Sequence, residues 1–303
     1  MRKALALMGG FGLLAWIAAG AITSEVPEVR AQTPAETGRT QKASYLPPAE
    51  GKDPLVVLAL GSDARPGVCM PVERCLADSI HLITANQREG GATVLGFPRD
   101  SYVDIPGFGQ GRINEALFDG GPELVVRTVE ELTGIPIDGY LLTSFEGLPR
   151  MVKEIGGLEV DVPYPMNDDA SGAVFDAGPQ VLEGREVLAF SRNRKNTPNG
   201  DFSRSENQGL VFLGALQQLR EQYRQNPVVL FEWIVAGAQN IQTDLSFPEL
   251  FELALASLTV DPERVDNIVV PGGIGMAGSA SIVVISDAAE QIYRDLKDDG
   301  LIG

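Results

Sequence analysis

The sequence predicts a single α/β domain over residues 53–303, preceded by a segment that directs export. Short apolar runs that end in polar loops alternate with helix-like segments at first, and helix-like segments cluster later. No linker-like break divides this region. With 44% hydrophobic and 21% charged residues, the chain of 303 residues is able to bury a sizeable core.

The N-terminus has the pattern of an export signal. Met1-Arg2-Lys3 is positively charged, and residues 4–22 contain no charged residue. This uncharged run is nearly as long as the ~20 residues that a membrane span needs. We therefore expect residues 1–24 to be a signal peptide or a membrane anchor, and residues 25–52, rich in Pro, Thr, Glu and Ala, to be a flexible linker. The domain then lies outside the cytoplasm, either anchored at the membrane or released from it if the signal is cleaved.

Strands are expected where apolar or alternating residues are bounded by turn residues. The first run ends in Gly61-Ser62-Asp63, and residues 158–162 alternate with a period of two. The expected strands are 55–60, 78–85, 92–97, 139–143, 158–162 and 265–270.

Helices are expected between these strands and beyond them. Pro122 has an early position in one helix, and Gly156-Gly157 ends another. Residues 166–179 are expected to form a loop or hairpin. The expected helices are 112–117, 122–133, 145–155, 182–190, 208–223, 227–240, 248–258 and 287–297.

Composition excludes several classes of function. Lys+Arg 24 against Asp+Glu 41 gives a net charge of −17, so nucleic-acid binding is not expected. The single histidine, His81, lies within an expected strand, where it is more often a packed residue than a base. Cys69 and Cys75 share one loop, and in an exported protein a disulfide is expected there rather than a catalytic thiol or a zinc site.

A basic stretch at residues 191–208 stands out against this acidic background. It holds Arg192, Arg194, Lys195 and Arg204. Pro198-Asn199-Gly200-Asp201 predicts a turn, after which Asp201 or Ser203 caps a helix with Arg204 in its first turns. An arginine there opposes the helix dipole, so a bound anion would favour the arrangement. The alternative is a solvated basic loop.

Two aspartates and six arginines at element ends suggest a diphosphate site with Mg²⁺. Asp63 follows the first strand and Asp78 opens the second, so antiparallel pairing would place both carboxylates at one edge, as Mg²⁺ prefers. Each aspartate could instead be a turn or cap residue, and each arginine a surface ion pair. No P-loop or Rossmann spacing is present. The arginines, which bind phosphate bidentately, are Arg65, Arg99, Arg112, Arg192, Arg194 and Arg204.

Several blocks in a fixed order resemble the LytR-CpsA-Psr family over about residues 55–208. Each block alone is weak, but the ordered set is specific, and the basic stretch is most similar to actinobacterial members. The blocks are Leu-Gly-Ser-Asp-Ala-Arg-Pro-Gly at 60–67, Ala-Asp-Ser-Ile at 77–80, Gly-Phe-Pro-Arg-Asp-Ser at 96–101, Arg-Ile-Asn-Glu-Ala at 112–116, Ile-Gly-Gly-Leu-Glu-Val-Asp-Val-Pro at 155–163, and Ser-Arg-Asn-Arg at 191–194 with Gly-Asp-Phe-Ser-Arg-Ser-Glu-Asn-Gln at 200–208.

The resemblance implies an exported, usually membrane-anchored, Mg²⁺-dependent phosphotransferase. Members of the family move a glycopolymer from a polyprenyl diphosphate carrier onto peptidoglycan through a phosphodiester. The implied fold is a twisted central β-sheet flanked by helices, with an apolar pocket for the lipid. A pyrophosphatase acting on the same lipid, and a non-catalytic wall-binding or regulatory protein, remain the alternatives.

The resemblance also assigns residues. Asp63 and Asp78 are implied to hold Mg²⁺, and Arg99, Arg192, Arg194 and Arg204 to bind the diphosphate with support from Gln208. Arg99, Arg192, Arg194 and Asp78 are the expected catalytic residues, and Arg65 and Arg112 complete the expected substrate-binding set. Asp100 and Asp201 are candidates for the base that activates the acceptor.

The chain departs from the family pattern at three positions. Leu76 stands where the family often has arginine, and Arg74 lies close enough in sequence to replace it. Arg112 stands where the family has lysine, and Lys195 where many members have histidine.

Overall fold

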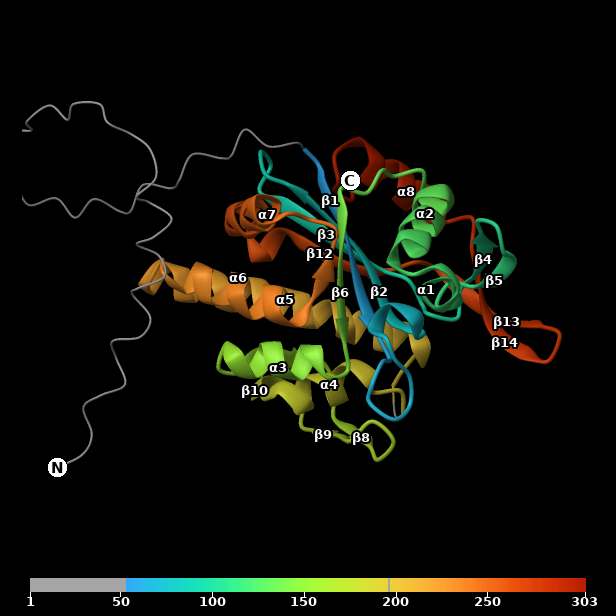
Figure 1. The fold of residues 1–303 in the computed structure, drawn as a ribbon, viewed down its shortest axis with the longest axis horizontal. Helices are drawn as coiled ribbons and strands as arrows, with labels where there is room; N and C mark the ends of the chain where they lie inside the picture. The colour runs from blue at the N-terminus through green and yellow to red at the C-terminus, as the bar shows by residue number, and fades with distance from the viewer. Residues whose placement is uncertain (1–52, 196) are drawn as a thin grey trace, which may run out of the picture. The chain divides into compact units, whose positions relative to one another are not determined.

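The computed structural model describes residues 53–195 and 197–303 (Figure 1). The expected signal or anchor, residues 1–24, and the linker, residues 25–52, lie outside the described residues, so the domain boundaries stay predictions. Within the described ranges, no helix combines the length and hydrophobicity needed to cross a bilayer.

A six-stranded mixed sheet forms the centre of the domain. Strand β1 pairs antiparallel with β2 and parallel with β6, while β3 pairs antiparallel with β2 and parallel with β12. The strands, in spatial order, are β11 (Gln242–Thr243), β6 (Gly139–Ser144), β1 (Leu55–Ser62), β2 (Ala77–Asn86), β3 (Gly91–Gly96) and β12 (Val265–Val269).

One face of the sheet packs against three helices, α1 (Glu115–Gly120), α2 (Pro122–Thr133) and α8 (Ala289–Asp298). Because side chains alternate along a strand, Leu58 and Leu82 point together to this face, and both are fully buried. Leu117 of α1, Leu124 of α2 and Leu296 of α8 belong to the same core. Figure 1 shows these helices on one side of the sheet.

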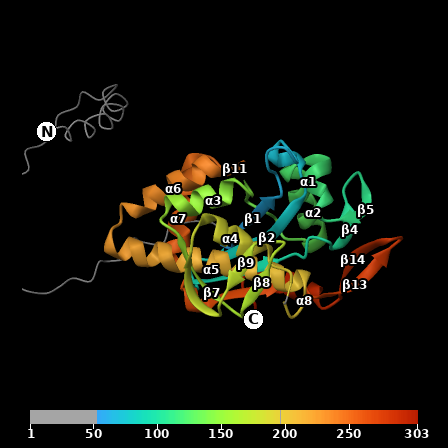
Figure 2. The same ribbon diagram turned by 90° about the horizontal axis from the view of Figure 1, so that it is seen from below.

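A larger group of helices covers the other face of the sheet. Helix α5 contacts β2, β3 and β12 of the sheet, and α3 and α4 pack together with α5 beside them (Figures 1 and 2). Their cores centre on Phe190 of α4 and on Leu219 and Leu230 of α5 and α6. The helices are α3 (Gly147–Glu154), α4 (Gly184–Arg192), α5 (Asp201–Gln225), α6 (Val229–Asn240) and α7 (Phe247–Thr259).

Glycines let α5 approach its neighbours closely. A β-carbon at Gly96 of β3 would lie 2.3 Å from the Ser205 hydroxyl oxygen, and one at Gly214 would lie 2.2 Å from the Glu159 carbonyl oxygen. A larger residue at Gly96 would push the start of α5 away from the sheet, and a larger residue at Gly214 would push the middle of α5 away from the strand that carries Glu159. The start of α5 carries Arg204 and Gln208, so the close approach positions two of the expected site residues.

Four short antiparallel strand pairs lie outside the central sheet. The pairs are β4 (Tyr102–Ile105) with β5 (Gly109–Arg112), β7 (Leu158–Val162) with β10 (Gly178–Leu182), β8 (Met166–Asp168) with β9 (Ala173–Phe175), and β13 (Gly272–Ala277) with β14 (Ala280–Ile285).

The expected α/β fold with a helix-flanked central sheet is confirmed, and α2 and β7 have the expected bounds. Two local predictions were wrong. Arg112 does not begin a helix: it ends β5 by pairing with Tyr102, and α1 begins at Glu115. Neither Asp201 nor Ser203 caps α5, because the N-cap is Gly200 at a positive φ of 56° and Asp201 is already helical.

His81 is a packed residue, as expected. It is fully buried, its Nε2 donates to the Ser205 carbonyl (3.0 Å), its Nδ1 faces the Ser79 hydroxyl (3.1 Å), and its ring lies 5.4 Å from that of Phe212. Burial lowers the pKa of His81 to about 4, so the ring is neutral in the folded protein at pH 7.

We expect His81 to make the protein less stable in mild acid. In the unfolded chain its pKa is near 6.5, so the unfolded state binds more protons as the pH falls from 6.5 to 4, and the free energy of unfolding drops by roughly 3 kcal/mol over that window. Urea unfolding at pH 7 and pH 4.5 measures the drop, which His81→Gln should reduce. Because the chain has only 1 histidine, its ring NMR signals titrate without overlap; a midpoint near 6.5 in the folded protein would contradict the expectation.

Candidate functional site

The site lies at the edge of the sheet where β1 ends and β2 begins. Ser62 pairs with Ala77 in the antiparallel ladder, so Asp63 and Asp78 lie at the same edge, as expected. The amide of Asp63 donates to the Leu76 carbonyl (2.9 Å), and the Leu76 amide donates to Asp63 Oδ1 (3.1 Å). Asp63 forms no ion pair with any described residue, which leaves its charge available to a ligand.

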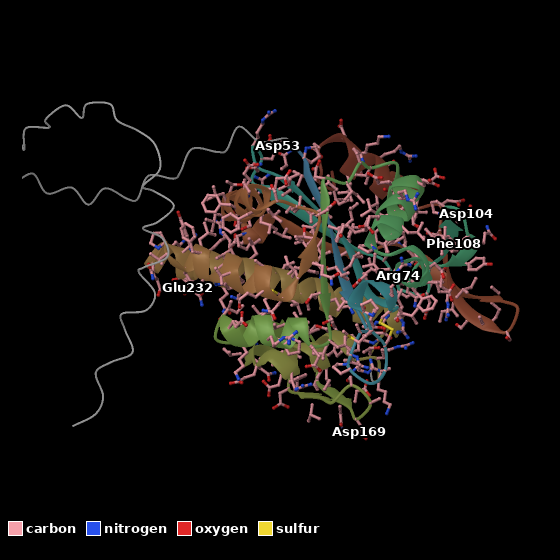
Figure 3. All side chains as sticks on the ribbon, in the orientation of Figure 1. Asp53, Arg74, Asp104, Phe108, Asp169 and Glu232 are labelled. Carbon is pink, nitrogen blue, oxygen red and sulfur yellow. A yellow bond between two sulfur atoms is a disulfide. The ribbon has the colours of Figure 1, made fainter. Side chains whose placement is uncertain are left out.

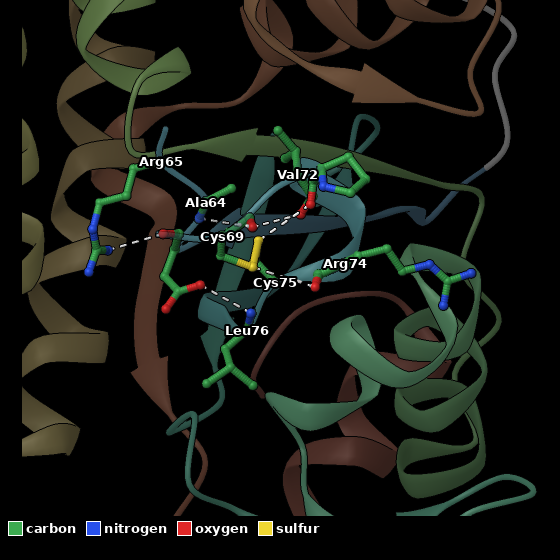
Figure 4. The surroundings of a disulfide bond; sticks show 10 residues. Ala64, Arg65, Cys69, Val72, Arg74, Cys75 and Leu76 are labelled. Atoms are coloured by element: carbon green, nitrogen blue, oxygen red, sulfur yellow. Dashed lines mark hydrogen bonds between the residues drawn. A yellow bond between two sulfur atoms is a disulfide. The ribbon is translucent and has the colours of Figure 1, made fainter. Parts of the chain in front are cut away.

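The expected disulfide between Cys69 and Cys75 is present and closes the loop between these two strands (Figure 4). In the same loop, Arg65 donates to the Asp63 carbonyl (3.1 Å). Arg74 points away toward helix α1 and donates to the Asp119 carbonyl (3.0 Å), so it does not join the site in place of the arginine that Leu76 replaces.

Asp78 is the centre of the charged cluster. Its side chain is 7% exposed; Oδ1 lies 2.5 Å from Arg99 Nη1 and 3.1 Å from Arg204 Nη1, and Oδ2 lies 4.0 Å from Arg192 Nε. Burial alone would raise the pKa of Asp78, but the three guanidinium groups outweigh it and hold the pKa below its usual value. The carboxylate therefore stays ionised.

Arg204 is a buried arginine, with 3% of its side chain exposed. It bridges Asp78 and Asp201, whose Oδ1 is 2.7 Å from Arg204 Nη2 and 3.9 Å from Arg194 Nε. Burial lowers the pKa of Arg204 despite both carboxylates, but an arginine remains charged at any physiological pH.

Arg192 occupies a more open position at the end of α4, with a third of its side chain exposed. Its guanidinium lies 4.5 Å from the centre of the Phe145 ring, and that of Arg65 lies 5.4 Å from the same ring. Stacking on an aromatic ring fixes a guanidinium while leaving its N–H groups free for an anion. Phe145 was not expected to take part in the site.

Arg112 joins the cluster through Asp100. Arg99 Nε lies 3.8 Å and Arg112 Nη1 3.9 Å from Asp100 Oδ1, and Arg112 also binds Glu115 (2.6 Å). All six expected arginines are thus connected: three directly to Asp78, Arg194 through Asp201, Arg112 through Asp100 and Arg65 through Phe145.

The side chain of Gln208 makes hydrogen bonds that hold three elements of the site together. Its Nε2 donates to the backbone carbonyls of Asp78 (3.1 Å) and Ser191 (3.0 Å), which ties β2 and α4 to α5. Gln208 therefore fixes the positions of Asp78 and Arg192 relative to Arg204.

Asp168 is a residue that the sequence analysis missed. Buried at the end of β8, it accepts from the backbone amides of Arg194 (3.2 Å) and Lys195 (3.3 Å) and so holds the basic loop in place. Burial would raise the pKa of Asp168, but these amides and that of Ala170 lower it to about 2. The sequence signal was only an aspartate in a turn region, and the loop it holds lies 26 residues further on.

An apolar cavity adjoins the charged cluster. It consists of two hollows of ≈ 270 and ≈ 330 Å³ that share Leu141, Phe212 and Trp233 in their walls. The first hollow reaches Asp78 and Arg192, and the second continues between the sheet and helices α5, α6 and α7. An elongated apolar ligand with a strongly anionic end matches this combination.

Comparison with known proteins agrees with this geometry. The family model described as the LytR_cpsA_psr family matches residues 22–298. The chain is 37% identical to the polyisoprenyl-teichoic acid–peptidoglycan teichoic acid transferase TagU of Enterococcus faecalis over 206 residues, which is 67% of this chain and 66% of that protein. It is 37% identical to the transferase of the same description, TagT, of Bacillus subtilis over 257 residues, 82% of this chain and 78% of that protein.

A solved structure shows the same fold. The crystal structure of Bacillus subtilis TagV superposes with a TM-score of 0.70 at 25% identity, covering 83% of this chain and 98% of that one.

Proposed function

The chain belongs to the LytR-CpsA-Psr family, and we propose that it moves a glycopolymer from a polyprenyl diphosphate carrier onto peptidoglycan during cell-wall assembly. One observation carries the proposal: an apolar cavity ends at Asp78 and Arg192, inside a cluster of arginines. A polyprenyl diphosphate has the complementary form, a long apolar chain joined to two phosphates.

The arginines supply the charge neutralisation that phosphoryl transfer requires. In the proposed reaction the acceptor hydroxyl oxygen bonds to the phosphorus that carries the sugar, and its proton passes to a carboxylate beside the arginines, Asp100 or Asp201. The bond from that phosphorus to the bridging oxygen breaks, and polyprenyl phosphate leaves with the electron pair. Arg192 lines the cavity and faces Asp78 Oδ2, whereas Arg99 binds Asp78 Oδ1, so the two guanidinium groups would contact the two phosphates.

We propose that Asp63 and Asp78 hold Mg²⁺. The described residues contain no group of three or more histidine, cysteine, aspartate or glutamate side chains placed to hold a metal ion. Mg²⁺ nevertheless often uses one or two carboxylates with substrate phosphates, and Asp63 has no cationic partner among the residues that the structure describes, so the donor set fits. The ion would neutralise charge on the diphosphate and its leaving group.

Asp63→Asn is expected to weaken Mg²⁺ binding about tenfold or more, because it removes one of two anionic ligands. Calorimetric titration of Mg²⁺ into the full chain, with a non-hydrolysable diphosphate lipid present, measures this without relying on turnover. Asp161→Asn, an exposed carboxylate on β7, is the control. Equal affinity in Asp63→Asn and in the unchanged chain would refute the metal assignment.

The proposed location is the outer face of the cell membrane, anchored through residues 1–24, or the cell wall if that segment is cleaved. The disulfide between Cys69 and Cys75 supports an oxidising compartment.

The test uses the full chain in detergent with Mg²⁺ and a synthetic polyprenyl diphosphate sugar. Transfer predicts that the sugar phosphate becomes bound to added peptidoglycan and that polyprenyl phosphate is released. Release of soluble sugar phosphate at an equal rate without peptidoglycan would favour a pyrophosphatase. Lipid binding without product, even with peptidoglycan, would favour a non-catalytic wall-binding protein.

A further inference from the structure

Two hairpins, β4–β5 and β13–β14, extend from the turn that carries Arg99 and Asp100. The Val283 amide of β14 donates to the Asp100 carbonyl (2.8 Å), and Ser101 forms a bridge with Val283. Figures 1 and 2 both show the two hairpins side by side at one end of the domain. We call them together the hairpin platform.

In Figure 1 the hairpin platform and the helices α6 and α7, which line the apolar cavity, lie on opposite sides of the central strands. Arg192 lines the cavity and faces Asp78 Oδ2, whereas Arg99 binds Oδ1 and leads through Asp100 to Arg112 at the end of β5. The charged side chains therefore form a row from the cavity to the hairpin platform.

The platform exposes apolar side chains, and β13–β14 is uncharged, while β4 carries an exposed carboxylate, Asp104. Residues 267–286 contain no Asp, Glu, Lys or Arg, although the chain has a net charge of −17. Ile274 is 83% exposed and Met276 63%, and on the β4–β5 turn Phe108, labelled in Figure 3, is 58% exposed. Exposed apolar patches of this kind mark binding surfaces, because water solvates them poorly.

We propose that the hairpin platform binds the acceptor, a neutral glycan strand of peptidoglycan, and so presents its hydroxyl to the phosphorus. This inference rests on the proposed function. In phosphoryl transfer the attacking and leaving oxygens lie roughly in line. If polyprenyl phosphate leaves into the cavity at Arg192, the acceptor hydroxyl approaches from the side of Arg99 and the platform.

The chemistry of the surface favours a glycan over other occupants. Sugar rings present C–H faces that pack on exposed apolar and aromatic side chains, and their uncharged hydroxyls need no counter-charge. A ribbon that binds an anionic bilayer normally pairs apolar residues with lysine or arginine, and β13–β14 has neither.

The test compares the double variant Ile274→Ser/Met276→Ser with Val174→Ser/Val181→Ser. The control valines are 69% and 66% exposed and lie on other two-stranded hairpins. With the full chain in detergent, the KM for peptidoglycan oligosaccharides is expected to rise about tenfold in the first variant, while kcat and the KM for the lipid-linked donor stay unchanged. The control should leave all three constants unchanged.

A second measurement separates this inference from the proposed function. Unlabelled peptidoglycan oligosaccharide is titrated into the isotope-labelled full chain, and binding is followed by NMR. Loss of binding in Ile274→Ser/Met276→Ser supports the platform even if no transfer is detected, which would count against the proposed function alone. Unchanged acceptor KM and binding would overturn the inference, as would a variant that instead loses self-association or vesicle binding.

Discussion

Arg192→Ala is expected to lower glycopolymer transfer roughly 10²–10³-fold while leaving the stability of the domain nearly unchanged. Arg192 lines the end of the apolar cavity and contacts Asp78 only loosely, at 4.0 Å. A third of its side chain is exposed, and surface substitutions usually change stability by only about 0.5 kcal/mol. Its charge is therefore free to act on the diphosphate.

The matched control is Arg185→Ala on the same helix, α4. Arg185 is 76% exposed and faces Glu146 at 3.6 Å, away from the cavity. Both variants are compared by transfer rate, by the Kd for the lipid-linked donor and by urea midpoint. An Arg192→Ala protein that is unfolded, or that transfers at the rate of the Arg185→Ala protein, would contradict the assignment.

A second substitution, Arg192→Lys, tests whether the positive charge of Arg192 alone accounts for its effect. Lysine keeps the positive charge but loses the planar group that stacks on Phe145, 4.5 Å away, and that binds phosphate bidentately. We expect an intermediate rate, well below that of the unchanged chain. Full activity in Arg192→Lys would mean that only the charge matters.

The sequence predicted that Asp63 and Asp78 lie at one edge of the sheet, because the residues that indicate this lie close together in the chain. Asp63 and Asp78 flank two apolar runs joined by one short loop, and antiparallel pairing of those runs is sufficient to bring both carboxylates to one edge. The disulfide depended only on two cysteines in the same loop.

The burial of each arginine could not be predicted in the same way. Arg204, unlike Arg192, is buried because the start of α5 packs close to the sheet, which depends on side-chain space at Gly96. Gly96 lies far from Arg204 in the sequence, so the residues around Arg204 do not indicate how closely α5 approaches β3.

Strands β11 and β13 were not predicted from the sequence, for a different reason. Strand β11 has two residues, and β13 is rich in glycine, so neither shows a clear period of alternation. The hairpin β13–β14 is held in place by Asp100 and Ser101, which lie far from it in the sequence. A feature fixed by such distant contacts leaves little local pattern.

Asp78→Asn is expected to abolish transfer and also to destabilise the protein by about 3 kcal/mol. Asp78 is a partner of Arg204, whose side chain is 3% exposed, so removing the carboxylate leaves a buried guanidinium with Asp201 as its remaining partner. Breaking a buried pair costs far more than losing an exposed one, because water cannot solvate the remaining charge.

The free energy of unfolding in urea measures this effect, with Asp161→Asn as the exposed isosteric control. The arginines lower the pKa of Asp78 in the folded protein, so its stabilising contribution is present above its ordinary pKa of 3.8 and is lost as the pH falls below that value. The difference between Asp78→Asn and the unchanged chain should therefore shrink below pH 4. A difference that stays constant with pH would mean that packing, rather than charge, makes the variant unstable.

A double-mutant cycle with Arg204→Met tests why Asp78→Asn is unstable. If Arg204 is unstable in Asp78→Asn because it is an unpaired buried charge, then adding Arg204→Met should recover part of the lost stability. Transfer should not return, because both the carboxylate and a guanidinium of the site are gone. Recovery of stability would show that the unpaired guanidinium of Arg204 is what destabilises Asp78→Asn, whereas additive losses of stability would mean that Asp201 alone satisfies Arg204.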